Sequence, residues 1–462
     1  MQLGFETIGN ATIIFHCNGP LLTTDPWVYG EPYFGSWRMS HEIPDKQLMN
    51  INQSKYFWIS HGHPDHLDLA TLDYHKDKII LIGNHYGNRI KNDLVNDGFN
   101  VKVLKYNSWE QISRNVSVKC IADYNQDSIL LVRMLDDLII NTNDASSRGW
   151  SSIVKKEISQ AKRSFFTCLS GYGDADMFNI YDGNDNFIGK NSPEIVRKEF
   201  KVGKNIQSLL EYFGADFFVP TSSFHKYQRE DSIWANAYTT KVEDYSTGFD
   251  SSEKILLNPF IRFDLISDTL TEINPNEKND LVKSPIDYGD NWSDDLDKND
   301  FKKIETYFNK IELLKTRMDF ITFNIGNTEK TISFNNKSNK KGLIFSGPRN
   351  SLMTAIKYKI FDDLLIGNFM KVKIIGEWPY TWPLYYDFCP LVPKYSDNGN
   401  VYNKTELKKY FIFYFKRNLK YEILDFINDR KKYFINIIKN NRILYRIFKN
   451  IYILFFKIRN QL

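Results

Sequence analysis

Three of the eight histidines lie within six consecutive residues, His61-Gly62-His63-Pro64-Asp65-His66. This segment directly follows the apolar run Tyr56–Ser60, so three imidazoles and one carboxylate are expected on a loop at the end of a strand. Such a cluster is costly to hold together unless a divalent cation neutralises the carboxylate and shares the nitrogen lone pairs. An accidental polar loop explains the pattern poorly in a chain with so few histidines. The segment therefore predicts a metal site.

The elements that must position this loop follow from the pattern of the first half of the chain. Short β-rich runs alternate there with turn signals and helical stretches, which is typical of a mixed α/β domain. The strands that we expect are Thr12–Phe15, Leu21–Thr24, Tyr56–Ser60, Ile79–Ile82, Val101–Leu104, Val116–Ala122, Ile129–Met134, Leu138–Asn141, Phe165–Leu169 and Phe217–Pro220. The helices that we expect are Leu69–His75, Asn88–Asp97, Ser151–Ala161 and Pro193–Phe213.

Composition divides the rest of the chain. The sequence turns polar and acidic between about residues 250 and 300, which indicates a connecting region or a long surface excursion. We therefore predict a first domain over 1–250, a polar connecting region over 251–300, a small C-terminal α/β unit over 301–400 and a basic aromatic helical tail over 401–462.

The tail carries 15 Lys and Arg against 4 Asp and Glu, a net charge of +11. Because the whole chain is at +4, residues 1–400 are mildly acidic, which argues against nucleic acid as the substrate. The apolar residues of the tail are too dense for a solvated face and too often interrupted by charge for a transmembrane span. Two alternatives stay open: a helical pair that packs on the acidic body, or a peripheral anchor on the inner face of a membrane.

Cysteine usage and the start of the chain bear on compartment and cofactor. The four cysteines are far apart, and none forms a C-x-x-C pair or has a histidine close behind it. This excludes a zinc ribbon and a Rieske iron–sulfur site. The first residues resemble no signal peptide and no run of 18 apolar residues occurs, so a cytoplasmic protein is expected.

The strand followed by His-x-His-x-Asp-His resembles the metallo-β-lactamase superfamily, whose αββα sandwich holds one or two metal ions at its edge. The resemblance implies that His61 and His63 bind one metal and that Asp65 and His66 bind the other. It also implies a bridging carboxylate after a later strand, a position matched by Asp144, and a last histidine, matched by His225. As alternatives, Asp144 is an Asx turn or helix cap, and His225 is a histidine of a surface loop.

The remaining ligand position departs from the superfamily pattern, because no histidine lies between His85 and His225. The corresponding segment offers Asp123 instead. A carboxylate in place of an imidazole moves the preference of the site toward iron or manganese. The alternative for Asp123 is a solvated turn residue.

Several further segments resemble the metallo-β-lactamase-like region of the CMP-N-acetylneuraminate hydroxylase family, namely Asp25–Val28, Gly35–Glu42, Tyr56–Leu72 and Ser351–Gly367. The resemblance implies an α/β fold, a metal-dependent oxygenase, and a nucleotide-activated sialic-acid-like sugar or related glycan as substrate. Iron would activate dioxygen, and Asp65 would act as a catalytic base as well as a ligand. Because the chain has no Rieske-type Cys/His pairs, the electrons would come from an external donor.

Two other functions are compatible with the same residues. A metallo-hydrolase would use one or two zinc, manganese or iron ions to cleave a phosphoester, including phospholipid head groups, a lactone or an amide. A non-catalytic binding protein would retain a degenerate site.

Overall fold

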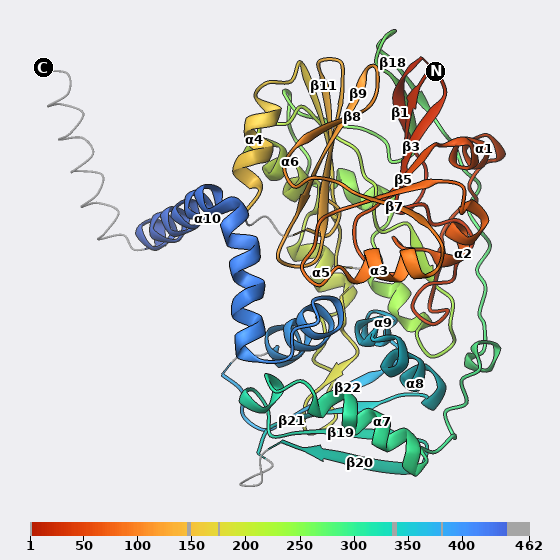
Figure 1. Cartoon of the computed structure of the whole chain (residues 1–462), viewed down its shortest axis with the longest axis vertical. Coiled ribbons are helices and arrows are strands. Elements are labelled where there is room, and N and C mark those ends of the chain that lie inside the picture. The colour runs from red at the N-terminus through yellow and green to blue at the C-terminus, as the bar shows by residue number, and fades with distance from the viewer. Residues whose placement is uncertain (1, 146–148, 174–175, 335–339, 380–381, 441–462) are drawn as a thin grey trace, which may run out of the picture.

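The computed structural model describes residues 2–145, 149–173, 176–334, 340–379 and 382–440. A pair of β-sheets packs face to face in the amino-terminal region, with helices on both outer faces, and a smaller α/β unit lies below them in Figure 1. The predicted αββα sandwich with a smaller C-terminal unit is confirmed.

The first sheet has eight strands in the order β18-β17-β1-β2-β3-β5-β6-β7. Strands β3, β5, β6 and β7 are mutually parallel, and the others are antiparallel to their neighbours. In chain order the strands are β1 (Leu3–Thr7), β2 (Ile13–Cys17), β3 (Pro20–Thr24), β5 (Tyr56–Ile59), β6 (Ile79–Ile82), β7 (Asn100–Val103), β17 (Ile261–Asp264) and β18 (Thr269–Glu272).

The second sheet has seven strands in the order β16-β14-β12-β11-β10-β9-β8. Its strands are β8 (Trp109–Ser113), β9 (Val116–Ala122), β10 (Ser128–Met134), β11 (Asp137–Asn141), β12 (Arg163–Thr167), β14 (Phe217–Phe218) and β16 (Ile255–Leu256). A separate two-stranded ribbon pairs β4 (Trp37–Met39) with β15 (His225–Tyr227).

Alternation of side chains along the strands builds the layers. In β10, Leu130, Val132 and Met134 belong to the core between the two sheets, whereas Ile129 and Leu131 belong to the outer core under α4 (Ser151–Ile158) and α6 (Val202–Phe213). The outer face of the first sheet is covered in the same way by α1 (Asp45–Gln53), α2 (Leu69–Leu72) and α3 (Arg89–Asn96). Both faces of the central strands of each sheet are therefore covered, whereas the edge strands β18 and β7 keep exposed residues.

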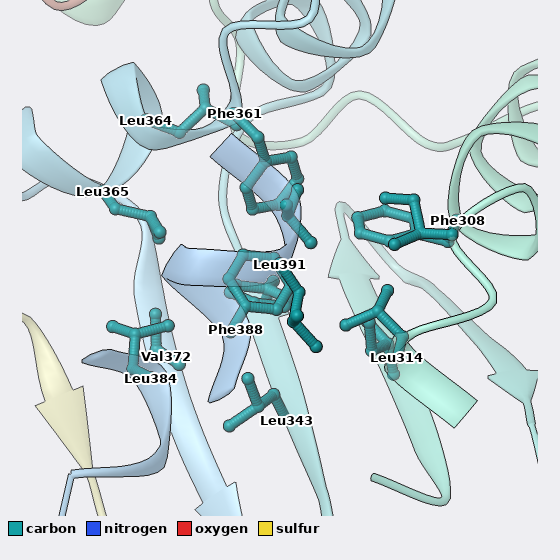
Figure 2. Packing of buried hydrophobic residues seen from close by; sticks show 14 of the residues in the cluster. Phe308, Leu314, Leu343, Phe361, Leu364, Leu365, Val372, Leu384, Phe388 and Leu391 are labelled. Atoms are coloured by element: carbon teal, nitrogen blue, oxygen red, sulfur yellow. The ribbon is translucent and has the colours of Figure 1, made fainter. Parts of the chain in front are cut away.

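The C-terminal unit is built on a five-stranded sheet in the order β13-β22-β21-β19-β20. Phenylalanines and leucines from its strands, helices and π-helical turns fill one core, seen in Figure 2 around Phe308, Phe361 and Phe388. The strands are β13 (Ile180–Tyr181), β19 (Phe320–Ile325), β20 (Thr328–Ser333), β21 (Gly342–Ser346) and β22 (Lys371–Ile375), and the helical segments are α7 (Lys298–Asn309), α8 (Arg349–Tyr358), α9 (Phe361–Ile366), and the π-helical segments Leu384–Phe388 and Pro390–Asn398.

The predicted elements of the first half all occur, with ends that differ by a few residues. One predicted helix is divided into α5 (Pro193–Glu199) and α6. The prediction that residues 251–300 form only a polar connection is corrected by the structure. Strand β16 belongs to the second sheet, and β17 and β18 belong to the first sheet. The short alternation Ile261-Arg262-Phe263, with both apolar residues buried, is what places β17 in the first sheet.

The basic tail begins as the helix α10 (Lys404–Asn440), which has a non-helical residue at Asn418. Its first turns pack on the body, because Tyr410 and Tyr414 are buried in the core of the C-terminal unit. Beyond Asn418, Asp425 accepts hydrogen bonds from the Gly149 backbone and from Ser152. Residues 441–462 of the predicted tail lie outside the described residues. Over the described stretches of the chain, no helix combines the length and the apolar character needed to cross a membrane.

Candidate metal centre

The histidine-rich loop connects the end of β5 to the start of α2. Strand β5 is buried between β3 and β6, and its backbone continues directly into Ser60 and His61. At the other end the Asp68 side chain caps α2 and also accepts a hydrogen bond from the Gly30 backbone at 3.0 Å. A buried strand and a capped helix therefore hold both ends of the loop.

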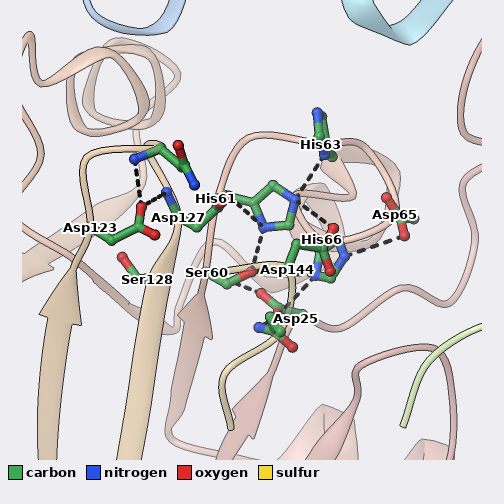
Figure 3. Close-up of polar contacts among 12 residues, drawn as sticks. Asp25, Ser60, His61, His63, Asp65, His66, Asp123, Asp127, Ser128 and Asp144 are labelled. Carbon is green, nitrogen blue, oxygen red and sulfur yellow. Dashed lines mark hydrogen bonds and ion pairs between the residues drawn. The ribbon is translucent and has the colours of Figure 1, made fainter. Parts of the chain in front are cut away.

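His61, His63 and Asp144 form a first group of donor atoms. One atom of each residue lies within 4.8 Å of the corresponding atoms of the other two. His61 Nε2 is 2.9 Å from His63 Nδ1 and 3.7 Å from Asp144 Oδ2 (Figure 3). Asp144 comes from the turn after β11, so the ends of two different strands meet at this point. Two imidazole nitrogens and a carboxylate at this spacing fit a divalent transition metal.

Asp65, His66 and His225 line a small adjoining cavity of about 20 Å³, together with Asp144. His66 Nε2 lies 3.4 Å from Asp65 Oδ2. His225 stacks on Trp37 with ring centroids 3.4 Å apart, and neither of its ring nitrogens has a hydrogen-bond partner among the described residues. A buried imidazole without partners costs free energy. Among the described residues, however, only His61, His63 and Asp144 have donor atoms that all lie within 4.8 Å of one another, so a second metal position at Asp65, His66 and His225 stays a prediction.

Outer hydrogen bonds fix the orientation of these side chains. Asp25 Oδ2 lies 3.1 Å from His66 Nδ1, and the Ser60 hydroxyl lies 2.9 Å from His61 Nδ1. Asp65 accepts hydrogen bonds from Asn10 at 2.9 Å and from the Tyr33 hydroxyl at 2.5 Å. Carboxylates that hold the second nitrogen of a ligating histidine set its tautomer and raise its basicity.

The structure places Asp123 in a turn rather than among the histidines. Its Oδ1 accepts hydrogen bonds from the backbone N–H groups of Asn125 at 2.7 Å and Asp127 at 3.2 Å. The carboxylate that reaches the site from this segment is Asp127, whose Oδ1 is 3.9 Å from His61 Nδ1. Burial, followed by the charges of Asp123 and Asp144, raises the pKa of Asp127 well above its usual value. A ligand role for Asp123 remains a prediction. Asp127 is the carboxylate of this segment whose contact with His61 the structure shows.

The C-terminal unit contributes to the same centre through Asp362 of α9. Asp362 Oδ2 lies 3.0 Å from His63 Nε2. Burial by itself would lower the pKa of His63, but the hydrogen bond and charge of Asp362 outweigh it and raise that pKa to about 10. Asp65 and Asp25 similarly overcome burial and raise the pKa of His66 to about 10. The carboxylates thus make the site attractive to cations, whether protons or metal ions.

A cavity of about 420 Å³ opens from His61, His63 and Asp144 between the sandwich and the C-terminal unit. Its lining includes three cationic side chains, Arg89, Lys91 and Lys394. Burial lowers the pKa of Lys394 to about 8, although Asp123 and Asp127 partly offset that effect. The cavity therefore combines the candidate metal ligands with cationic side chains.

Three acidic residues of the site were not predicted from the sequence: Asp25, Asp127 and Asp362. Asp25 and Asp362 lie in segments that carry the family resemblance, but no pattern in the sequence indicated that their side chains contact His66 and His63. For Asp127 the signal was the same strand-end segment that contains Asp123. No local pattern indicates which of two carboxylates four residues apart turns toward a histidine.

No family model matches the chain. Cytidine monophosphate-N-acetylneuraminic acid hydroxylase of Gorilla gorilla gorilla is 24% identical over 218 residues, covering 45% of this chain and 36% of that protein. The Sus scrofa hydroxylase is 23% identical over 221 residues, covering 45% of this chain and 50% of that protein. A further relative, from Homo sapiens, is named as an inactive form of the same hydroxylase. The chain thus matches half or less of the length of these relatives.

Among solved structures, a mutant of the CmlA beta-hydroxylase has a TM-score of 0.37 at 12% identity, covering 57% of this chain and 54% of that chain. Igni18, a metallo hydrolase from Ignicoccus hospitalis, has a TM-score of 0.34 at 10% identity, covering 59% of this chain and 99% of that chain.

The layers, the strand-end loop and the relatives agree on the class of protein. The chain has a metallo-β-lactamase-like αββα fold, with the His-x-His-x-Asp-His loop directly after β5 of the first sheet. The expected resemblance to the metallo-β-lactamase-like region of the CMP-N-acetylneuraminate hydroxylases is confirmed by the matches in sequence.

Proposed function

We propose that the protein is a metal-dependent enzyme that hydroxylates a nucleotide-activated sialic-acid-like sugar or a related anionic glycan. The observation that carries the proposal is the shared cavity, which is lined by His61, His63 and Asp144 and also by Arg89 and Lys394. The relatives' names support the substrate class. A bound iron ion would supply the activation of dioxygen, with electrons from an external donor.

The chain's own residues would divide the work between the two ends of the cavity. Lys394 and Arg89 would hold an anionic group of the substrate, because a cation in a largely buried pocket attracts anions more strongly than one on the surface. Asp65 is held by Asn10 and Tyr33 and would serve as ligand and base. Asp362 would keep His63 oriented through its hydrogen bond.

The test is incubation of the iron-loaded protein with CMP-N-acetylneuraminate, dioxygen and a reductant, with mass spectrometry of the products. We expect a product that has gained one oxygen atom. Lys394→Gln should raise KM by about tenfold or more, because it removes a charge-assisted contact, whereas Lys408→Gln on the exposed start of α10 should not. A metal-loaded protein that gives no oxygenated product from this or related anionic glycans contradicts the proposal.

A metallo-hydrolase is the second candidate, and the position of Asp144 favours it, because Asp144 belongs to the donor group of His61 and His63 and also lines the small cavity of Asp65, His66 and His225. Paired metal ions on either side of a bridging carboxylate are suited to activate water against a phosphoester, lactone or amide. Release of cytidine monophosphate or of a head group without oxygen consumption would establish this reaction. A protein that binds no metal under any growth condition would leave only a non-catalytic binding role.

The tail is proposed to contact anionic membranes. In α10 the apolar residues Leu419, Ile423 and Ile427 are each at least half exposed and recur every four residues, on a helix rich in Lys and Arg. Flotation with anionic vesicles should therefore recover the full chain more strongly than a chain that ends at Asn418, which keeps the buried Tyr410 and Tyr414. Equal recovery of the two proteins would assign the tail to packing or partner docking.

A further inference from the structure

A second cleft lies in the C-terminal unit, outside the candidate metal centre. It has a volume of about 990 Å³ and is bounded by α7, α8 and the end of the π-helical segment at Asp397. Its lining contains six cationic side chains but only two carboxylates, Asp300 and Asp397. The cationic residues are Lys302, Lys303, Lys310, Arg349, Lys357 and Lys359.

The two carboxylates do not neutralise the lysines. Asp300 forms an ion pair with Arg349, whose Nε donates a hydrogen bond to Asp300 Oδ2 at 2.6 Å. Asp397 accepts a hydrogen bond from the Tyr307 hydroxyl at 2.7 Å and is only 1% exposed. Among the described residues, Lys302, Lys303 and Lys357 make no ion pair. Like charges gathered from two helices repel one another, so this arrangement favours an anion between them.

The cleft also offers groups for the uncharged portion of a ligand. Met353, Ile356 and Tyr402 line it, and Lys310 lies over the Tyr402 ring at 3.9 Å from its centroid. In the described structure, Asp397 Oδ1 is buried and has no hydrogen-bond partner. A hydroxyl group of a ligand at the floor would satisfy this oxygen.

The cleft lies next to the cavity of about 420 Å³ that opens from the candidate metal centre. Arg89 lines that cavity and donates from Nη1 to Asn398 Oδ1 at 2.8 Å and from Nη2 to the Tyr358 carbonyl at 2.9 Å. Tyr358 lines the second cleft, and Asn398 follows its floor residue Asp397. One layer of side chains therefore separates the two cavities.

We infer that this cleft is a binding site for a small hydroxyl-bearing phosphate ester, separate from the site of the proposed reaction. Lys302, Lys303 and Lys357 bind the phosphate, and the hydroxyl-bearing portion lies toward Asp397. The ligand is a soluble ester rather than a lipid head group, because the lysines line a cleft of about 990 Å³ rather than a flat surface. The inference does not depend on the proposed function.

The experiment is isothermal titration of the full chain with glycerol phosphate and with inorganic phosphate. Glycerol phosphate should bind more tightly, because only it carries alcohol hydroxyl groups on a carbon backbone that can extend from the phosphate toward Asp397. Lys302→Gln combined with Lys303→Gln should weaken the binding of both probes by about tenfold or more, because two charge-assisted contacts are lost. The matched control, Lys298→Gln combined with Lys315→Gln, removes the same charge from exposed residues outside the cleft and should leave both affinities unchanged.

Asp397→Leu should remove the preference for glycerol phosphate while inorganic phosphate still binds. Failure of the wild-type chain to bind either probe, or equal weakening in the cleft variant and in its control, overturns the inference. The inference is also overturned if the chain binds phosphoinositide vesicles but neither soluble probe, and if Lys302→Gln combined with Lys303→Gln abolishes the vesicle binding. Catalytic turnover is not measured in any arm, so a failure here leaves the proposed function standing, and the reverse also holds.

Discussion

The two regions that meet at the candidate metal centre contribute to it in different ways. The sandwich supplies histidines and carboxylates from one short loop and from the ends of later strands, where parallel neighbours converge. The C-terminal unit supplies single residues, Asp362 and Lys394, from segments hundreds of residues away in the chain. The sandwich thus provides the candidate donor atoms and most of the hydrogen bonds that orient them, and the C-terminal unit adds a carboxylate beside His63 and one of the three cationic side chains of the cavity.

The largest effect is expected on the sandwich side of this comparison. The double variant His61→Ala, His63→Ala should lose nearly all bound transition metal, because both imidazoles belong to the same donor group. Metal content of the purified protein, measured by mass spectrometry of the elements, checks this. His75→Ala removes an imidazole outside the centre and should keep the wild-type content. Unchanged metal in the double variant would show that the loop is not the metal site.

On the side of the C-terminal unit, Asp397 should make stability depend on pH. Burial, against the opposing hydrogen bond from Tyr307, raises the pKa of Asp397 to about 7. The folded state then holds this proton more tightly than the unfolded state, so the free energy of unfolding should fall as pH rises from about 4 to about 7. Asp397→Asn should remove that component of the slope and stabilise the protein at pH 8 by about 4 kcal/mol at most. Urea unfolding of both proteins across this pH range tests it, and parallel curves would contradict it.

Asp362 tests whether the C-terminal unit acts on the metal. Asp362→Asn should weaken metal affinity by about 10- to 100-fold, because the variant no longer has a negatively charged oxygen beside His63 Nε2. The neighbouring Asp363 provides the control: Asp363→Asn changes a carboxyl group of the same helix, whereas the hydrogen bond with His63 Nε2 in the described structure is made by Asp362. Competition with a chelator measures the affinities. Equal affinities in both variants and wild type would restrict the metal site to the sandwich.

The smallest effect distinguishes Asp123 from Asp127. Asp123→Asn keeps an oxygen that can accept the two turn hydrogen bonds and should leave metal affinity within about threefold of wild type, whereas Asp127→Asn should lower it by about tenfold or more. If Asp123 is itself a ligand, as the sequence predicted, Asp123→His should raise zinc affinity. Bound metal after growth with iron and with zinc separates the two carboxylates.

How much of the molecule could be predicted depended on whether the signal was local. The strands and helices of the sandwich follow from alternation and turn residues over short windows, as in β9 and β10. The strands β17 and β18 were missed because they lie in a polar segment and join the sheet through pairing with β1, far away in the chain. Pairing over such a separation leaves little trace in local composition.

The sequence by itself determined the fold class and the loop with three imidazoles and a carboxylate, because that chemistry is written in six consecutive residues. It also determined that Asp144 and His225 follow strands. Only the tertiary structure decided that Asp127 rather than Asp123 turns toward His61, that Asp362 binds His63, and that His225 is stacked on Trp37 with its nitrogens unpartnered in the described structure. The physical reason is that a hydrogen bond depends on ångström-scale positions, which are set by the packing of elements distant in the chain and not by the residue types alone.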